Sequence, residues 1–255
     1  MARADDSVMD GCALEVCVDS VEGAIAAREG GAHRVELCAA LLEGGVTPSE
    51  GLVGLTVERA GIPVHVMIRP RGGDFRYSAL ELEVMERDIR AAARLGAAGV
   101  VLGLLEEDGS IDRVHTRALA SVARPMNVTF HRAFDMTRDP FEALEALIEI
   151  GIGRLLTSGQ ERTALEGLDL LADLTRRARG RIAVMPGGGI TARSLRKILD
   201  ATGARDVHVT GRAILESPMR HRNTRCFLGG ELRPPEYSRT VTDRARIAEL
   251  AAILR

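Results

Sequence analysis

The sequence has few cysteines, no excess of positive charge and no long apolar run, and each absence excludes a class of protein. Four cysteines among 255 residues, at irregular spacing, do not form the framework of a disulfide-rich scaffold. The formal net charge of -2 argues against a nucleic-acid-binding surface, which needs a basic face. No apolar run approaches the roughly 18 residues of a membrane span. We therefore expect a cytoplasmic protein that binds neither nucleic acid nor membrane.

Length and composition are those of one globular domain. Hydrophobic residues make up 45% of the chain and charged residues 27%. The first residues include Asp5, Asp6 and Asp10 and lack the apolar centre of a signal peptide. We predict a disordered leader over residues 1–12 and one domain over residues 13–255, with the tail and final helix of residues 213–255 packed on it.

Short apolar runs alternate with longer segments that have apolar residues at helical spacing. The runs are Ala13–Val18, Arg34–Cys38, Val64–Ile68, Gly99–Leu102, Met126–Phe130, Arg154–Leu156, Ile182–Met185 and Val207–Thr210. The clearest helical segments are Glu81–Leu95, Glu142–Ile150 and Leu165–Leu174, and a last helix is expected near Thr242–Leu254. Serial strand–helix units of this kind predict an α/β fold with parallel strands, either a closed (β/α)8 TIM barrel or an open doubly wound sheet. The length of roughly 250 residues and a glycine-rich segment after the seventh run favour the barrel.

Side chains alternate across a strand, so each predicted strand has two different faces. The apolar set must contact the helices, which leaves a polar set facing the barrel axis. That inward set is Glu15 and Cys17, then Arg34, Glu36 and Cys38, then His65, Met67 and Arg69, then Asn127, Thr129 and His131, and finally His208 and Thr210. Buried polar groups need partners. The acids and Arg69 either form a buried ion-pair network or meet a ligand.

The loops after the third and fifth strands add candidate catalytic groups. Arg69 and Arg71 stand in a glycine-containing loop, and arginine suits carboxylate or phosphate. His131 lies near Asp135 at a strand end, where a histidine serves as a general base, a metal ligand or a structural hydrogen-bonding group. The candidate catalytic residues are Glu15, Glu36, Arg69, His131 and Asp135.

The loops after the sixth, seventh and eighth strands are candidate anion sites. Gly187, Gly188 and Gly189 precede a helix that is expected to begin near Thr191, and free backbone N–H groups there bind anions. A tight turn is the alternative explanation for these glycines. The complete predicted anion- or substrate-binding set is Arg71, Thr157, Ser158, Gly187, Gly188, Gly189 and His208.

Cys17 and Cys38 are predicted to lie at matching heights on adjacent inward faces. Neighbouring strands are about 4.8 Å apart, so the two sulfurs can reach one soft ion. Thiolates and thioethers select Cu(I), zinc or iron–sulfur clusters, and Met67 follows on the next strand. The alternative is that both cysteines are small apolar core residues. No motif for an organic cofactor is present.

Several segments in order resemble the CutC copper-homeostasis family. They are Leu14–Ser20, Arg34–Cys38, Glu43–Gly45 with Thr47–Ser49, Ile68–Phe75, Thr129–Met136, Leu156–Gly159, Met185–Ile190 and Ser217–Arg220. The resemblance implies a TIM barrel, cytoplasmic residence, a role in copper homeostasis, Cu(I) bound by Cys17 and Cys38, and a homo-oligomer, either a dimer or a tetramer.

Two functions follow from these observations. One is copper binding by Cys17 and Cys38. The other is a lyase- or isomerase-type enzyme for a small phosphorylated or carboxylated metabolite, because most of the inward set consists of hard groups rather than soft ones. Replacing both cysteines should abolish the first activity, and replacing Glu36 or Arg69 should abolish the second.

Overall fold

The computed structural model describes residues 11–226, 228 and 235–254. Its central sheet has eight parallel strands in the order β7-β6-β5-β4-β3-β2-β1-β8. They are β1 (Ala13–Val18), β2 (Arg34–Leu37), β3 (Val64–Met67), β4 (Gly99–Leu102), β5 (Asn127–Phe130), β6 (Arg154–Thr157), β7 (Ala183–Pro186) and β8 (Asp206–Val209). Consecutive strands are neighbours, and a parallel bridge between Gly187 and His208 joins the two ends into a nearly closed barrel. The predicted barrel is confirmed.

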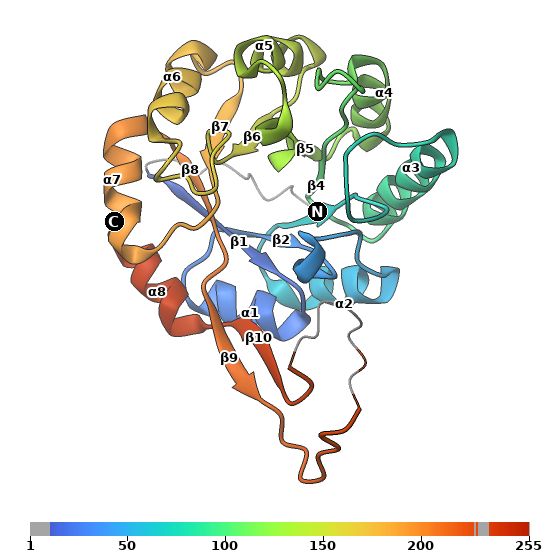
Figure 1. The fold of residues 1–255 in the computed structure, drawn as a ribbon, viewed down its shortest axis with the longest axis vertical. Coiled ribbons are helices and arrows are strands. Elements are labelled where there is room, and N and C mark those ends of the chain that lie inside the picture. Colours follow the sequence, from blue (N-terminus) through green and yellow to red (C-terminus); the bar gives the residue numbers. More distant parts are fainter. Residues whose placement is uncertain (1–10, 227, 229–234, 255) are drawn as a thin grey trace.

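Helices form a ring around the strands (Figure 1). They are α1 (Val21–Glu29), α2 (Glu50–Ala60), α3 (Ala79–Arg94), α4 (Arg113–Ala123), α5 (Pro140–Ile150), α6 (Leu168–Ala178), α7 (Ala192–Thr202) and α8 (Arg244–Ile253). Two short 3₁₀ turns, Leu41–Glu43 and Arg132–Met136, follow β2 and β5. Local sequence explains the helix ends: Asp139 caps α5 at its N-terminus with Pro140 in the first turn, and Gly151 ends it with φ of 90°.

The strand predictions agree with the structure to within one residue at each end. Alternation sorts the side chains as expected, because the apolar residues of each strand join the core between sheet and helices. The other face of the strands carries acids, histidines, arginines and thiols that are also buried. The barrel therefore positions a buried polar interior at its axis.

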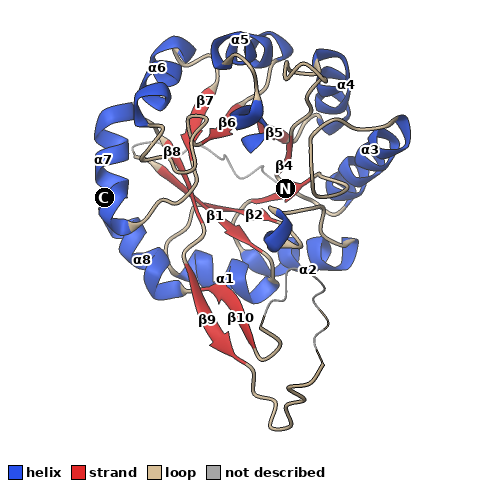
Figure 2. Cartoon of the chain, viewed as in Figure 1, coloured by secondary structure: helices blue, strands red, loops and turns tan. Residues whose placement is uncertain are grey.

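The C-terminal segment contains an element that the sequence pattern did not predict. Strands β9 (Arg212–Glu216) and β10 (Ser238–Thr242) pair antiparallel and project from the barrel (Figure 2). Helix α8 then packs against α1 and α7. The predicted leader falls largely on residues 1–10, which lie outside the described residues, as do residues 229–234. None of the described helices is long and apolar enough to span a bilayer.

Candidate functional site

An ion-pair network around Arg34 closes the barrel interior at the N-terminal ends of the strands, which we call its lower end. Its Nε donates to Glu15 Oε2 at 2.6 Å and its Nη2 to Asp206 Oδ1 at 2.5 Å. The side chains of Arg34 and Glu15 are fully buried. The sequence alternative paired Glu15 with Arg69. The cation is instead Arg34, because the strand register places it directly beside Glu15.

Glu15 connects this network to the layer above. Its second oxygen lies 2.8 Å from His208 Nδ1, and His208 Nε2 lies 3.8 Å from Glu36 Oε2. Burial raises the pKa of Glu15, but the Arg34 charge and the His208 hydrogen bond hold it well below its usual range. Burial opposes the charge on His208, whereas Glu36, Cys17 and Glu15 raise its pKa well above the usual value. The interior therefore holds charged groups in compensating pairs.

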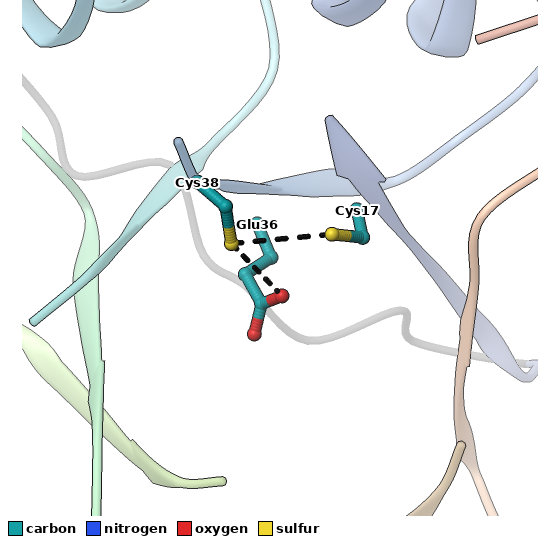
Figure 3. A group of neighbouring side chains, drawn as sticks. All are labelled: Cys17, Glu36 and Cys38. Atoms are coloured by element: carbon teal, nitrogen blue, oxygen red, sulfur yellow. Dashed lines mark hydrogen bonds between the residues drawn. The ribbon is translucent and has the colours of Figure 1, made fainter. Parts of the chain in front are cut away.

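Cys17 and Cys38 lie together at the C-terminal ends of β1 and β2, the upper end of the barrel (Figure 3). Their sulfurs are 3.9 Å apart, and Cys38 Sγ is 3.5 Å from Glu36 Oε2. The register pairs Cys17 with Glu36 rather than with Cys38, which differs from the prediction of matching heights. Strands tilt in a barrel, so an inward residue finds its nearest inward neighbour farther along the next strand. The tilt itself brings the two sulfurs together.

The two thiols differ in acidity. A hydrogen bond from Cys38 and the adjacent His208 lower the pKa of Cys17 well below the usual thiol value. That same hydrogen bond, together with burial, raises the pKa of Cys38 well above it. Burial also raises the pKa of Glu36 to about 8. Of the two thiols, Cys17 is therefore the one whose environment favours the thiolate.

Two overlapping groups of side chains have metal-ligand geometry. One is Cys17, Glu36 and Cys38, and the other is Glu15, Glu36 and His208; within each group the ligand atoms lie within 4.8 Å of one another. Met67 and Val101 pack with both cysteines in a small apolar cluster. The first group combines soft sulfur ligands with apolar surroundings, whereas the second is hard and already paired.

A cavity of about 370 Å³ opens above this layer at the C-terminal ends of the strands. Seven of the predicted site residues line it: Cys17, Glu36, Arg69, His131, His208, Gly188 and Gly189. The remaining predicted residues lie outside the lining: Glu15, Cys38, Arg71, Asp135, Thr157, Ser158 and Gly187.

Arg71 and Asp135 have structural partners that account for their positions. Arg71 pairs with Glu81 and Asp74 on the outer side of its loop. Asp135 accepts hydrogen bonds from Thr157 and Ser158 and pairs with Arg132 at 2.7 Å. The side chains of Arg71 and Asp135 therefore do not line the cavity. Asp135 acts by fixing Arg132, which does line the cavity.

Arg69 enters the cavity wall from the end of β3 and is only 6% exposed. One terminal nitrogen donates to the carbonyls of Glu43 and Gly45, and the other donates to the carbonyl of Gly73. Among the described residues no carboxylate pairs with it. Carbonyl dipoles hold the guanidinium rigidly but leave its full positive charge uncompensated.

His131 is held in one tautomer. Its Nδ1 accepts a hydrogen bond from the backbone N–H of Ala133 at 3.1 Å, so the proton of the neutral ring resides on Nε2. Within the described part of the chain Nε2 has no hydrogen-bond partner, although the residue is only 4% exposed. Gly103 makes room for the ring, since a Cβ there would lie 2.4 Å from Cε1. Burial and the Arg69 charge lower the pKa of His131 to about 3.

This lowered pKa predicts a specific dependence of stability on pH. Below pH ~6.5 His131 binds a proton in the unfolded chain but not in the folded chain. The free energy of unfolding therefore falls as pH falls. Between pH 7 and 5 this contribution amounts to about 2 kcal/mol. A His131→Asn variant should lack it, as urea unfolding at both pH values will test. Equal pH slopes for the variant and the parent protein would contradict a neutral buried ring.

Sequence reasoning missed several residues of the site. Arg34 was recognised as inward-facing but assigned no role, and Arg132 and Arg212, which line the cavity, were not selected. Phe75 also lines it, in a ring contact with His131 at 5.2 Å between centroids. The charge of these arginines was a visible signal. The direction of Arg132 and Arg212 was not, because neither lies in a strand of the barrel, where alternation applies.

Comparison with known proteins shows which family this chain is similar to. The model of the CutC family matches residues 12–213. A copper homeostasis protein cutC homolog from Homo sapiens is 52% identical over 96% of this chain and 89% of its own length. A family protein CutC from Mesorhizobium japonicum is 48% identical over 94% of this chain and 93% of its own length. The crystal structure of a CutC protein from Streptococcus agalactiae superposes with a TM-score of 0.72 at 34% identity, over 77% of this chain and 97% of that one.

Proposed function

The chain belongs to the CutC family, and from this premise we propose that it is a copper homeostasis protein that binds Cu(I) through Cys17 and Cys38. The separation of 3.9 Å between the two sulfurs is the observation that carries the proposal. With metal–sulfur bonds of about 2.3 Å, one ion fits between them at an S–metal–S angle of about 115°. A small outward rotation of either side chain opens this angle towards the linear geometry of a two-coordinate ion.

The surroundings of the pair favour a soft, singly charged ion. Cys17 and Cys38 contact Met67 and Val101, and both cysteines are buried. Thiolate and thioether ligands select Cu(I), and an apolar shell disfavours ions that keep several waters. Glu36 is the nearest carboxylate, at 3.5 Å from Cys38 Sγ. The lowered pKa of Cys17 favours a thiolate, which supplies one negative charge to a single Cu(I).

Anaerobic titration with Cu(I) against a competing chelator tests the proposal. We expect one ion per chain, with a copper X-ray absorption spectrum dominated by sulfur neighbours at about 2.2–2.3 Å. Zn²⁺ in the same assay is the comparison, because it prefers four ligands in a tetrahedron and should bind more weakly here. A spectrum with only oxygen or nitrogen neighbours, or no retained copper, would overturn the assignment.

We also propose that the protein acts in the cytoplasm as a homo-oligomer. The cytoplasmic location is supported by the cysteines, since Cys12, Cys17, Cys38 and Cys226 are all free thiols. The oligomeric state rests on the family resemblance alone and stays a prediction.

A second candidate function is an enzyme of lyase or isomerase type for a small anionic metabolite. The cavity favours it, because its lining holds Arg69, His131, Glu36 and His208, hard groups that a soft metal ion does not use. In this function Glu36 moves a proton, Arg69 binds the anionic group, and the Nε2–H of His131 donates a hydrogen bond to it. Substituting Glu36 or Arg69 separates it from copper binding, which depends on the cysteines.

A further inference from the structure

We propose that the cavity binds a small hydroxylated organic anion, with its carboxylate or phosphate between Arg69 and His131 and a hydroxyl at Glu36. This inference rests on the second candidate function and specifies the class of its substrate. It is independent of the copper proposal, because it uses none of the sulfur ligands.

The first observation is the uncompensated charge of Arg69. Its guanidinium is buried in the cavity wall and is held by three carbonyl groups rather than by a carboxylate. The other buried arginine of the interior, Arg34, has two carboxylate partners. Because a buried cation without a counter-ion is unfavourable, the wall at Arg69 is complementary to an anion.

The second observation is the unpartnered donor of His131. The Ala133 N–H occupies Nδ1, so Nε2 can only donate, and it has no acceptor among the described residues. The ring is neutral and fixed by its fit against Gly103. A neutral donor next to a cation recognises an oxygen that carries negative charge, as in an oxyanion site.

Phe75 brings the two groups to one place. The Arg69 guanidinium carbon lies 5.0 Å from the centre of the Phe75 ring, and the His131 ring lies 5.2 Å from that same centre. Both side chains therefore contact one aromatic side chain of the cavity lining, and Arg69 is close enough for its charge to lower the pKa of His131. This arrangement favours one anionic group over two separate binding positions.

The opposite end of the ligand follows from Glu36. Its Oε2 is engaged with Cys38, whereas Oε1 has no hydrogen-bond partner within the described chain. A carboxyl group at the floor of the cavity with one unpartnered oxygen, and donors at its wall, are complementary to a molecule with a hydroxyl at one end and an anion at the other. A volume of about 370 Å³ limits this ligand to the size of a small metabolite. Arg132 and Arg212 also line the cavity, and each has a carboxylate neighbour of its own, Asp135 and Asp19.

Calorimetric titration at low ionic strength, with four probes, tests the inference. Glycerate and glycerol 3-phosphate carry a hydroxyl with a carboxylate or a phosphate, inorganic phosphate carries the anion alone, and glycerol carries no charge. We expect one of the two hydroxylated anions to bind more tightly than inorganic phosphate, and glycerol not to bind. Which of the two binds identifies the anionic group.

Variants locate the site. Arg69→Met and His131→Phe should each weaken the preferred probe by about tenfold or more, since each removes a charge-assisted or fixed donor. Arg76→Gln removes an arginine from the same loop that is 60% exposed and pairs with Glu107, and it should bind like the parent protein. In ¹⁵N-histidine-labelled protein, the Nε2–H resonance of His131 should shift when the probe is added, a readout that stays valid if Arg69→Met folds poorly.

Three outcomes would overturn the inference: no probe binds at millimolar concentration, the Arg69 and His131 variants bind as tightly as the parent, or the His131 resonance does not move. A protein with both cysteines replaced by serine should retain anion binding. Failure of copper binding with intact anion binding would therefore count against the copper proposal alone, and the reverse result against this inference alone.

Discussion

Replacing Cys17 and Cys38 together by serine should lower the affinity for Cu(I) by about four orders of magnitude or more. The sulfurs are 3.9 Å apart, and they supply both thiol ligands of the group at the barrel mouth. Thiolate ligation accounts for most of the binding free energy of structural metal–sulfur sites, so a hydroxyl in each position leaves only Met67 and Glu36 as neighbours. Anaerobic competition with a chelator measures the loss.

The remaining cysteines provide a matched control. Cys12 is half-buried and directly precedes β1, and Cys226 is exposed in the segment that follows β9. A protein with both of these replaced by serine should bind Cu(I) like the parent. Single replacements of Cys17 or Cys38 should each retain weak binding through the remaining sulfur. Equal affinity of the Cys17/Cys38 double variant and the parent would exclude this pair as the copper site.

The position of this pair shows what a strand pattern can predict. Alternation in Ala13–Val18 and Arg34–Cys38 requires Cys17 and Cys38 to face the axis, because Val16, Val18, Val35 and Leu37 must contact the helices. The side of the sheet is therefore encoded locally. Their height along the axis is not, since it depends on the tilt of all eight strands, and the register in fact sets Cys17 beside Glu36.

The partners of the charged groups could not be predicted from the sequence either. Arg69 and Arg34 both face inward, yet Arg69 is held by loop carbonyls and Arg34 by carboxylates. The difference arises from the loops after β2 and β3, which supply the carbonyls of Glu43, Gly45 and Gly73, and loop conformation follows no period in the sequence. The ribbon of β9 and β10 was missed for a related reason, because its strands are partly exposed and lack an apolar face against the core.

Replacing Arg34 by methionine should destabilise the protein by about 3–5 kcal/mol, a second large effect. Methionine retains much of the side-chain volume but leaves Glu15 fully buried and Asp206 largely buried without their shared cation. Urea unfolding at neutral pH measures the loss directly, and thermal unfolding should show a fall in Tm of about 10 °C. Without the guanidinium between them, the two carboxylates of the barrel floor repel each other.

The pH dependence of this loss identifies its cause. The depressed pKa of Glu15 means that its stabilising contribution is complete above the pKa of the unfolded chain, about 4.5, and is lost as pH falls through the lower value of the folded state. The deficit of the Arg34 variant should therefore be full at pH 6–7 and shrink below pH ~4.5, where Glu15 in the variant is protonated. Adding Glu15→Gln to the variant should restore part of the stability, because it removes a buried carboxylate that has lost its arginine partner.

An exposed ion pair is the control for the size of the effect. Arg87 pairs with Glu83 on α3, with the two side chains 77% and 55% exposed, and such surface pairs contribute less than about 1 kcal/mol. Arg87→Met should therefore leave the unfolding midpoint nearly unchanged. If Arg34→Met were no more destabilising than Arg87→Met, the interior charges would be solvated rather than paired, and the barrel axis would be open to water at its lower end. A large loss that is partly rescued by Glu15→Gln instead indicates that the floor beneath the proposed copper and anion sites is dry and electrostatically closed.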